Sequence, residues 1–196
     1  MITIGLVLFE DFEELDFAGP WEVFGSAAEL TQGLRLTALA EAPDPVRGAK
    51  GLRILPDRTF ADAPPVDVLV VPGGIGTRRE VENPVMIDFL KRAAAGARLV
   101  TSVCTGSLLL HGAGLVQGLR VTTHWSFTDA LEARGDVTVV RDMRWVRDGR
   151  VVTAAGVSAG IDMSLWIVGE LFDPATARRV QRMIEYDPAP PYAAEI

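Results

Sequence analysis

Cys104, the single cysteine of the chain, lies between an apolar run and a helical one. Residues 97–101 are typical of a buried strand, and residues 107–110 of the first turn of a helix. The small residues Ser102 and Gly106 permit a sharp turn around the cysteine, as in the nucleophile elbow of hydrolases. Amides at the start of the helix would favour a thiolate. We therefore interpret Cys104 as a nucleophile with a lowered pKa; the alternative is a buried cysteine that acts as a small hydrophobic side chain.

Asp16 is the best acidic partner for Cys104 that the sequence offers, because it lies between two large apolar residues just before Gly19 and Pro20. Two roles are open. The carboxylate could cap the helix that follows, or it could occupy a poorly solvated pocket where a raised pKa suits it to proton transfer. Glu13 and Glu14 lie in a polar run, and we expect them in solvent.

A glycine-rich loop follows the apolar run at 67–71 and contains Gly73, Gly74, Ile75 and Gly76. Its amides could approach a substrate and donate to developing negative charge, as in an oxyanion hole. An ordinary tight turn would have the same composition. The loop lacks the lysine and hydroxyl residue of a phosphate-binding loop, and it does not open the first strand–helix unit, which disfavours nucleotide binding.

The remaining candidates are two histidines and an aspartate. His124 precedes Trp125, and a lone histidine is more often a packed or surface residue than a catalytic one. Its role at a site requires that its segment run beside the cysteine strand. His111 lies two helical turns after Cys104, and we expect a structural role. Asp162 lies early in a later helix, where it could stabilise the helix N-terminus or orient a loop.

Strands and helices alternate along the chain, which predicts an α/β fold: a three-layer α/β/α sandwich with a mostly parallel, flavodoxin-like sheet. Expected strands cover residues 2–9, 34–40, 67–71, 97–101, 121–123, 137–140 and 144–154, the last two as a hairpin around Asp148 and Gly149. Expected helices cover residues 19–30, 84–95, 158–172 and 174–186, and residues 46–60 form a small antiparallel excursion. No linker divides the chain, so we expect a single domain over 1–186 and an extended proline-rich tail over 187–196.

The positions of the loops connect this fold to chemistry. In an open parallel sheet, sites form at the carboxyl ends of central strands. Residues 10–20, residues 73–77 and the cysteine elbow each follow such a strand. We therefore expect these three loops to meet in one crevice.

Composition excludes several other classes of protein. None of the apolar runs approaches the ~20 residues that a membrane span needs. The sequence begins directly with an expected strand, without the features of a secretory signal. A single cysteine fits a reducing cytoplasm. The formal net charge of −7, without a basic block, argues against a nucleic-acid surface. Two histidines and the absence of CxxC or HExxH motifs disfavour a metal enzyme.

Together these motifs resemble the ThiJ/PfpI superfamily, whose fold is related to the class I glutamine amidotransferases. The matching segments span nearly the whole chain in order: 15–20, 71–74, 102–107, 122–125, 159–162 and the tail segment 185–191. An aspartate as acidic partner and a threonine, Thr105, after the cysteine resemble the isonitrile hydratase branch. Protease- and deglycase-like relatives generally carry a glutamate instead, and the proteases place a histidine after the cysteine. Some hydratases continue into a further helical segment beyond the length of this chain.

The resemblance implies a cofactor-independent lyase that needs no metal. Cys104 would attack an isonitrile, Asp16 would act as general acid and base, Thr105 would hydrogen-bond either group, and an N-substituted formamide would form. The loop at 73–76, His124 and Trp125 would contact the small-molecule substrate. The resemblance also implies a homodimer. From the composition we expect the chain in the cytoplasm, without nucleic-acid or membrane partners. The alternatives are an enzyme for reactive aldehydes, such as methylglyoxal, and a non-catalytic small-molecule or redox sensor related to AraC-type regulators.

Overall fold

The computed structural model describes residues 1–189, and a seven-stranded sheet forms its centre. In sheet order, the strands are β10 (Trp145–Asp148), β11 (Val151–Ala154), β7 (Leu99–Val103), β6 (Val68–Val71), β1 (Ile2–Val7), β2 (Leu34–Ala40) and β5 (Arg58–Thr59). All neighbours are parallel except β10 and β11, which form the expected hairpin. The predicted α/β class with a mostly parallel sheet is confirmed.

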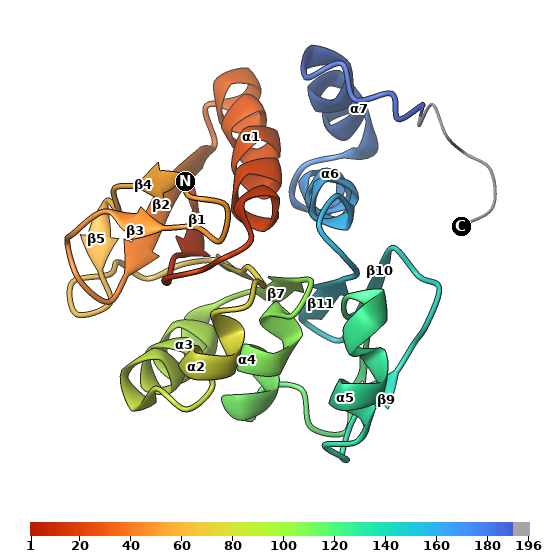
Figure 1. Cartoon of the computed structure of the whole chain (residues 1–196). Helices are drawn as coiled ribbons and strands as arrows, with labels where there is room; N and C mark the ends of the chain where they lie inside the picture. The colour runs from red at the N-terminus through yellow and green to blue at the C-terminus, as the bar shows by residue number, and fades with distance from the viewer. Residues whose placement is uncertain (190–196) are drawn as a thin grey trace.

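Helices cover both faces of this sheet (Figure 1). On one face lie α1 (Glu14–Thr31), α6 (Ala159–Leu171) and α7 (Pro174–Met183), which pack against one another. On the other lie α2 (Thr77–Glu80), α3 (Pro84–Gly96) and α4 (Gly106–Gly112), followed by η1 (Trp125–Phe127) and α5 (Thr128–Glu132). Strands β6 and β7 are buried along their whole length, which explains their continuous apolar character.

The central strands bring the expected loops together. Val71 of β6 pairs with Ser102 of β7, and Val103 of β7 pairs with Ala154 of β11. Because β1 lies on the other side of β6, the loops after β1, β6, β7 and β11 all emerge at one edge of the sheet. The three loops expected to meet therefore lie next to one another at this edge of the sheet.

The first helix differs from the prediction. It begins at Glu14 rather than at residue 19, so Pro20 lies inside it. Proline has no N–H to donate to the Asp16 carbonyl, but its fixed φ is compatible with a helix. Burial of the flanking residues, Phe17 and Val23 among them, offsets the one missing hydrogen bond.

Three smaller features complete the fold. The excursion contains the antiparallel pair β3 (Val46–Arg47) and β4 (Arg53–Ile54), and β5 returns to the main sheet. A separate two-stranded parallel sheet joins β8 (Arg120–Val121) to β9 (Thr138–Val139). Among the helices of residues 1–189, none combines the length and hydrophobicity that crossing a membrane requires.

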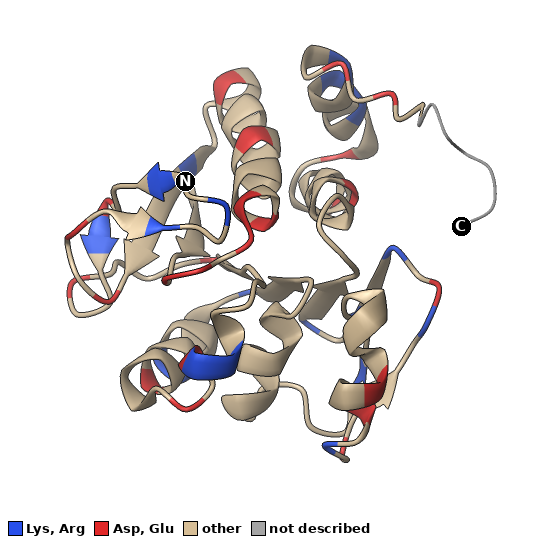
Figure 2. Ribbon diagram, viewed as in Figure 1, with Lys and Arg blue, Asp and Glu red and all other residues tan. Residues whose placement is uncertain are grey.

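Charged residues are unevenly distributed along the elements (Figure 2). Acidic residues follow one another along α1 and the loop before it, whereas α2 carries the adjacent Arg78 and Arg79. Most of the tail predicted to be extended, residues 190–196, lies outside the described residues, and the single-domain assignment of residues 1–186 stays a prediction.

Candidate active site

Cys104 occupies a sharp turn between β7 and α4, and its φ is +54°. This left-handed conformation is uncommon for a residue with a side chain and occurs mainly at turns and functional sites. The Cys104 N–H donates to the Ala155 carbonyl at 2.8 Å, which ties the turn to the end of β11. Gly106 is required, since a Cβ there would lie 2.2 Å from the Val71 carbonyl oxygen. The turn therefore has the geometry of a nucleophile elbow.

Asp16 lies in the first turn of α1 and is fully buried beside the sulfur of Cys104. Its Oδ2 accepts a hydrogen bond from the Gly73 N–H at 2.8 Å. Its Oδ1 is buried and has no hydrogen-bonding partner among the residues that the structure describes. The helix-cap interpretation is wrong, because Glu13 occupies the N-cap position.

The setting of this carboxyl group determines its protonation. Burial raises the pKa of Asp16 from 3.8 to about 8, although the Gly73 hydrogen bond opposes the shift. Near pH 7 the group is mainly the neutral acid. A protonated Asp16 beside a sulfur nucleophile is suited to proton donation.

The predicted low pKa of Cys104 is not found. Burial and the adjacent Asp16 carboxylate raise the pKa of the thiol from 9.0 to about 12. Hydrogen bonds from the backbone of Thr105 and Val157 lower it, as helix-start amides should, but they are outweighed. The resting pair at neutral pH is therefore a thiol and a carboxylic acid, and its protons are coupled.

Val157 was not singled out from the sequence. Its backbone amide lies beside the Cys104 sulfur, and its φ is +41°, a strained value for a β-branched residue. The position follows from the fold, because residues 155–158 connect β11 to α6 next to the elbow. Only the pairing of β11 with β7 reveals this contact.

The glycine loop positions the two candidate catalytic groups. The Gly73 amide holds Asp16, and the Gly74 amide donates to Thr105 Oγ1 at 3.1 Å. Gly76 packs against the backbone of Glu10, whereas Ile75 is exposed. The structure thus joins this loop to the site through Asp16 and Thr105, and direct contact of its amides with a substrate stays a prediction.

Gly73→Ala is expected to lower activity at Cys104 strongly and to destabilise the fold by roughly 2–4 kcal/mol. The added Cβ would lie 2.5 Å from the Thr105 nitrogen and 2.9 Å from the Cys104 Cβ, so the elbow must move. Gly25→Ala is the matched control, because a Cβ in that part of α1 meets nothing within 4 Å. It should be neutral or stabilise by up to about 1 kcal/mol. Thermal unfolding of both variants compares the two sites, and equal stability would contradict the packing argument.

A cluster of hydroxyl groups surrounds Thr105 on the side of α2. Thr77 Oγ1 lies 3.2 Å from Thr105 Oγ1 and donates to the Gly74 carbonyl at 2.8 Å. Arg78 Nη1 also donates to Thr105 Oγ1, at 3.2 Å. Neither Thr77 nor Arg78 was a sequence candidate, because nothing in their spacing from Cys104 indicates contact.

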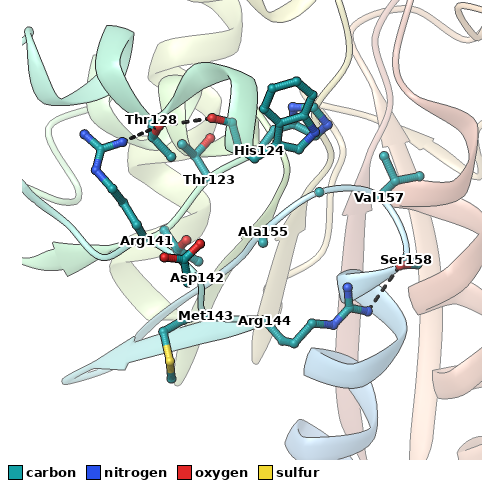
Figure 3. Close-up of a pocket in the computed structure, with 13 residues that line it drawn as sticks. Thr123, His124, Thr128, Arg141, Asp142, Met143, Arg144, Ala155, Val157 and Ser158 are labelled. Atoms are coloured by element: carbon teal, nitrogen blue, oxygen red, sulfur yellow. Dashed lines mark hydrogen bonds between the residues drawn. The ribbon is translucent and has the colours of Figure 1, made fainter. Parts of the chain in front are cut away.

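A pocket of about 800 Å³ lies next to the elbow, and both His124 and Trp125 line it. Figure 3 shows His124 and other lining residues. Val157 lines it while its amide faces the sulfur, and Thr123 lines it while its hydroxyl donates to the Cys104 carbonyl at 2.9 Å. The other lining residues are Thr122, Thr128, Arg141, Asp142, Met143, Arg144, Ala155, Gly156 and Ser158. The structure therefore places the predicted 124–125 segment beside the cysteine strand end.

The ring of His124 packs against Gly156, where a Cβ would lie 2.5 Å from His124 Cδ2. Burial lowers the pKa of His124, and the positive charge of Arg78 lowers it further, whereas the negative charge of Glu13 opposes both. The ring is therefore neutral at pH 7. Trp125 is 79% exposed and borders the pocket without being buried by the described residues.

The other acidic and basic candidates lie outside the thiol site. His111 Nε2 lies 3.0 Å from Asp136 Oδ1, a surface contact consistent with the expected structural role. Asp162 accepts from Arg144 Nε at 2.8 Å.

The expectation that Glu13 and Glu14 lie in solvent is wrong. Both side chains are largely covered and pair with Lys50, because the 46–60 excursion folds over the start of α1.

Comparison with known proteins identifies the family of the chain. Residues 3–170 match the DJ-1/PfpI family. The chain is 44% identical over 191 residues to an isonitrile hydratase of Pseudomonas putida, covering 97% of this chain and 81% of the relative. It is 30% identical over 167 residues to the glutathione-independent glyoxalase DJR-1.2 of Caenorhabditis elegans, covering 84% and 86% of the two chains.

A solved structure shows the same likeness in three dimensions. The crystal structure of a ThiJ/PfpI family protein from Pseudomonas syringae superposes with a TM-score of 0.91 at 38% identity, covering 100% of this chain and 79% of that one. The elbow, its acidic neighbour and the pocket beside them thus occur on a fold shared with both kinds of enzyme, and the chain belongs to the DJ-1/PfpI family.

Proposed function

We propose that this chain is an isonitrile hydratase-type lyase in which Cys104 is the nucleophile and Asp16 the general acid and base. The observation that carries the proposal is the buried pair itself: a thiol on a strained elbow beside a carboxyl group whose pKa is raised to about 8. The likeness to an isonitrile hydratase over nearly the whole chain supports the choice of substrate. The negative charge of Glu13 also raises the pKa of Asp16, and the opposing positive charge of Lys50 is not sufficient to keep the carboxyl group ionised near neutral pH.

The first step adds the sulfur and a proton to the same carbon. Once the pair has lost one proton to solvent, Asp16 is a carboxylate and the sulfur keeps its proton, because the pKa of the thiol is the higher of the two. The Asp16 carboxylate then removes the thiol proton as the sulfur attacks. The sulfur forms a bond to the terminal carbon of R–N≡C while the Asp16 proton passes to that carbon. The product is a thioimidate, R–N=CH–S–Cys104, and Asp16 is left as a carboxylate.

The second step adds water. The Asp16 carboxylate removes a proton from water as the oxygen bonds to the thioimidate carbon, and the nitrogen takes up that proton. The tetrahedral R–NH–CH(OH)–S–Cys104 then breaks its C–S bond, the hydroxyl proton returns to Asp16, and R–NH–CHO leaves. Dividing one difficult addition into two steps is the advantage of covalent catalysis.

Thr105 and Val157 have defined places in this scheme. The Thr105 side chain and the backbone amides of Thr105 and Val157 lower the pKa of the thiol and so stabilise negative charge on the sulfur. The apolar substituent of the substrate would enter the adjoining pocket beside His124 and Trp125. No cofactor takes part in either step.

A direct assay tests the proposal. The protein is mixed with an aryl isonitrile in ¹⁸O-labelled water, and we expect an N-aryl formamide that carries the label. Methylglyoxal is assayed in parallel, because the similarity to a glyoxalase makes aldehyde chemistry the competing activity. Turnover of the aldehyde without hydration of any isonitrile would overturn the proposal.

The pH dependence of kcat/KM is expected to have an ascending limb near pH 8. The reactive pair must first lose one proton, and the lower of its two pKa values is raised to about 8 by burial of Asp16. His124→Gln is the control, because the pKa of His124 is lowered from 6.5 and its own titration lies at more acid pH. The measurement is kcat/KM from pH 5 to 10 for the parent protein and for His124→Gln. If the ascending limb disappears in His124→Gln, the limb belongs to the histidine and not to Asp16.

The homodimer and the cytoplasmic location stay predictions. Sedimentation equilibrium of the purified chain tests the first.

A further inference from the structure

Arg78 is held against the thiol site by an unusual set of contacts for an exposed arginine. Its Nη1 donates to the Gly74 carbonyl at 3.1 Å, to Thr77 Oγ1 at 3.0 Å and to Thr105 Oγ1 at 3.2 Å. Its guanidinium carbon also lies 4.7 Å from the centroid of the Phe127 ring. One nitrogen and one face of the guanidinium are therefore fixed, and the side chain is pre-organised.

The remaining donors of Arg78 are free. Within residues 1–189, neither Nε nor Nη2 donates to a protein acceptor, and no carboxylate lies within ion-pair distance of this guanidinium. The neighbouring Arg79 differs, since it pairs with Glu80 and Asp11. In a chain with a net charge of −7, the Nε–H and Nη2–H groups of Arg78 thus form a fork of donors whose positive charge no carboxylate of residues 1–189 neutralises by an ion pair. Such a fork binds a carboxylate with two parallel hydrogen bonds.

Arg78 is connected to Cys104 through one intervening residue. Thr105 connects the two groups: its hydroxyl accepts from Arg78, and its side chain also borders the Cys104 sulfur. On the side of the pocket, the positive charge of Arg78 lowers the pKa of His124. Phe127, on which the guanidinium of Arg78 packs, follows the 124–125 segment that lines the pocket. Arg78 is therefore joined to the nucleophile through Thr105 and to the segment that lines the pocket through Phe127.

We propose that Arg78 is a specificity-determining residue that selects substrates carrying a carboxylate a few bonds from the carbon that Cys104 attacks. The choice of an isonitrile as the reacting group rests on the function proposed above. The preference for negative charge is a property of the site alone and extends to any reagent that reacts at Cys104. An isocyano carboxylate is the class of substrate that has both the isonitrile group and the negative charge.

A pair of alkylating reagents tests the charge preference without any turnover. The Cys104 thiolate displaces iodide from iodoacetate or iodoacetamide and forms a C–S bond in each case. The two reagents differ chiefly in a carboxylate against a neutral amide. A change in the pKa or exposure of the thiol affects both rates alike, so the ratio of the two rate constants isolates the contribution of charge.

We expect Arg78→Leu to lower the iodoacetate-to-iodoacetamide ratio at Cys104 by at least about threefold, and Arg79→Leu to leave it unchanged. Raising the salt concentration should lower the ratio in the parent protein and not in Arg78→Leu. Arg78→Lys keeps the charge without the fork and should give an intermediate ratio. Alkylation is followed by mass spectrometry, with Cys104→Ala as the blank. A ratio that is the same in Arg78→Leu as in the parent, or that falls equally in Arg79→Leu, would overturn the assignment.

Hydration supplies the second arm of the experiment. With isocyanoacetate, Arg78→Leu is expected to raise KM at least about threefold, and with its neutral methyl ester KM should not change. A protein that hydrates neither compound but keeps the alkylation preference would sink the proposed reaction and leave the role of Arg78 intact. If the protein hydrates both compounds, and Arg78→Leu leaves the KM for each unchanged, the proposed reaction stands and the role of Arg78 is overturned.

Discussion

Cys104→Ala is expected to lower kcat/KM for isonitrile hydration by at least about a thousandfold, because the covalent route requires a nucleophile at this position. Cys104 is the only cysteine of the chain, so no second thiol can replace it. The fold should survive, since alanine removes a single buried atom from a turn whose backbone is fixed by the Ala155 carbonyl and by Gly106. Formamide production and far-UV circular dichroism are measured on the same preparation.

Cys104→Ser sharpens this test. A serine has nearly the same shape, but its hydroxyl is far less acidic and the site offers it no adjacent histidine as base. We therefore expect Cys104→Ser to be almost as inactive as Cys104→Ala. Incubation of the parent protein with isonitrile, followed by acid quenching and mass spectrometry, should detect the thioimidate on Cys104. An active serine variant would exclude thiolate attack as the chemical step.

The sequence was sufficient to predict the elbow and the meeting of the three loops, since both follow from the patterns of strands and turns. Small residues around Cys104 indicated a tight turn, and the observed φ of +54° agrees. The alternation of strands and helices predicted a parallel sheet, and the pairing of β7 with β6 and β11 brings the loops together as expected. These features follow from hydrophobic periodicity and turn chemistry, which a single sequence carries.

Features that depend on contacts between distant segments could not be predicted. The amide of Val157 reaches the sulfur only because β11 pairs with β7, and Arg78 reaches Thr105 only because α2 packs against α4. The sign of the thiol pKa shift was predicted wrongly for the same reason: the helix-start amides are visible in the sequence, whereas burial and the charge of Asp16 are not.

The start of α1 was misplaced because proline is a strong signal for the first turn of a helix. In the structure, Pro20 lies well inside α1, and tertiary packing overrides that preference. The consequence reaches the site: a helix that begins at Glu14 directs Asp16 into the protein beside Cys104 instead of placing it at the solvent-facing cap.

Asp16→Asn is expected to stabilise the protein at alkaline pH. The pKa of Asp16 is about 8 in the folded state and 3.8 ordinarily, so the folded state binds the proton more tightly than the unfolded chain. Its contribution to stability is fully present below about pH 4 and is lost as the pH rises toward 8, where the buried carboxylate must ionise. Asparagine carries no charge and can keep the Gly73 hydrogen bond. The gain at pH 9 should be on the order of 6 kcal/mol.

Urea unfolding of the parent and Asp16→Asn proteins at pH 5, 7 and 9 measures this difference, which should grow with pH. Asp162→Asn is the control, because it removes a partly exposed ion pair with Arg144 and should cost at most about 1 kcal/mol. A gain from Asp16→Asn that does not depend on pH would show that Asp16 is not the group that titrates. The same variant should lose hydration activity, since an amide cannot deliver the proton. A residue whose replacement stabilises the fold and removes the chemistry is one whose burial serves the reaction rather than the structure.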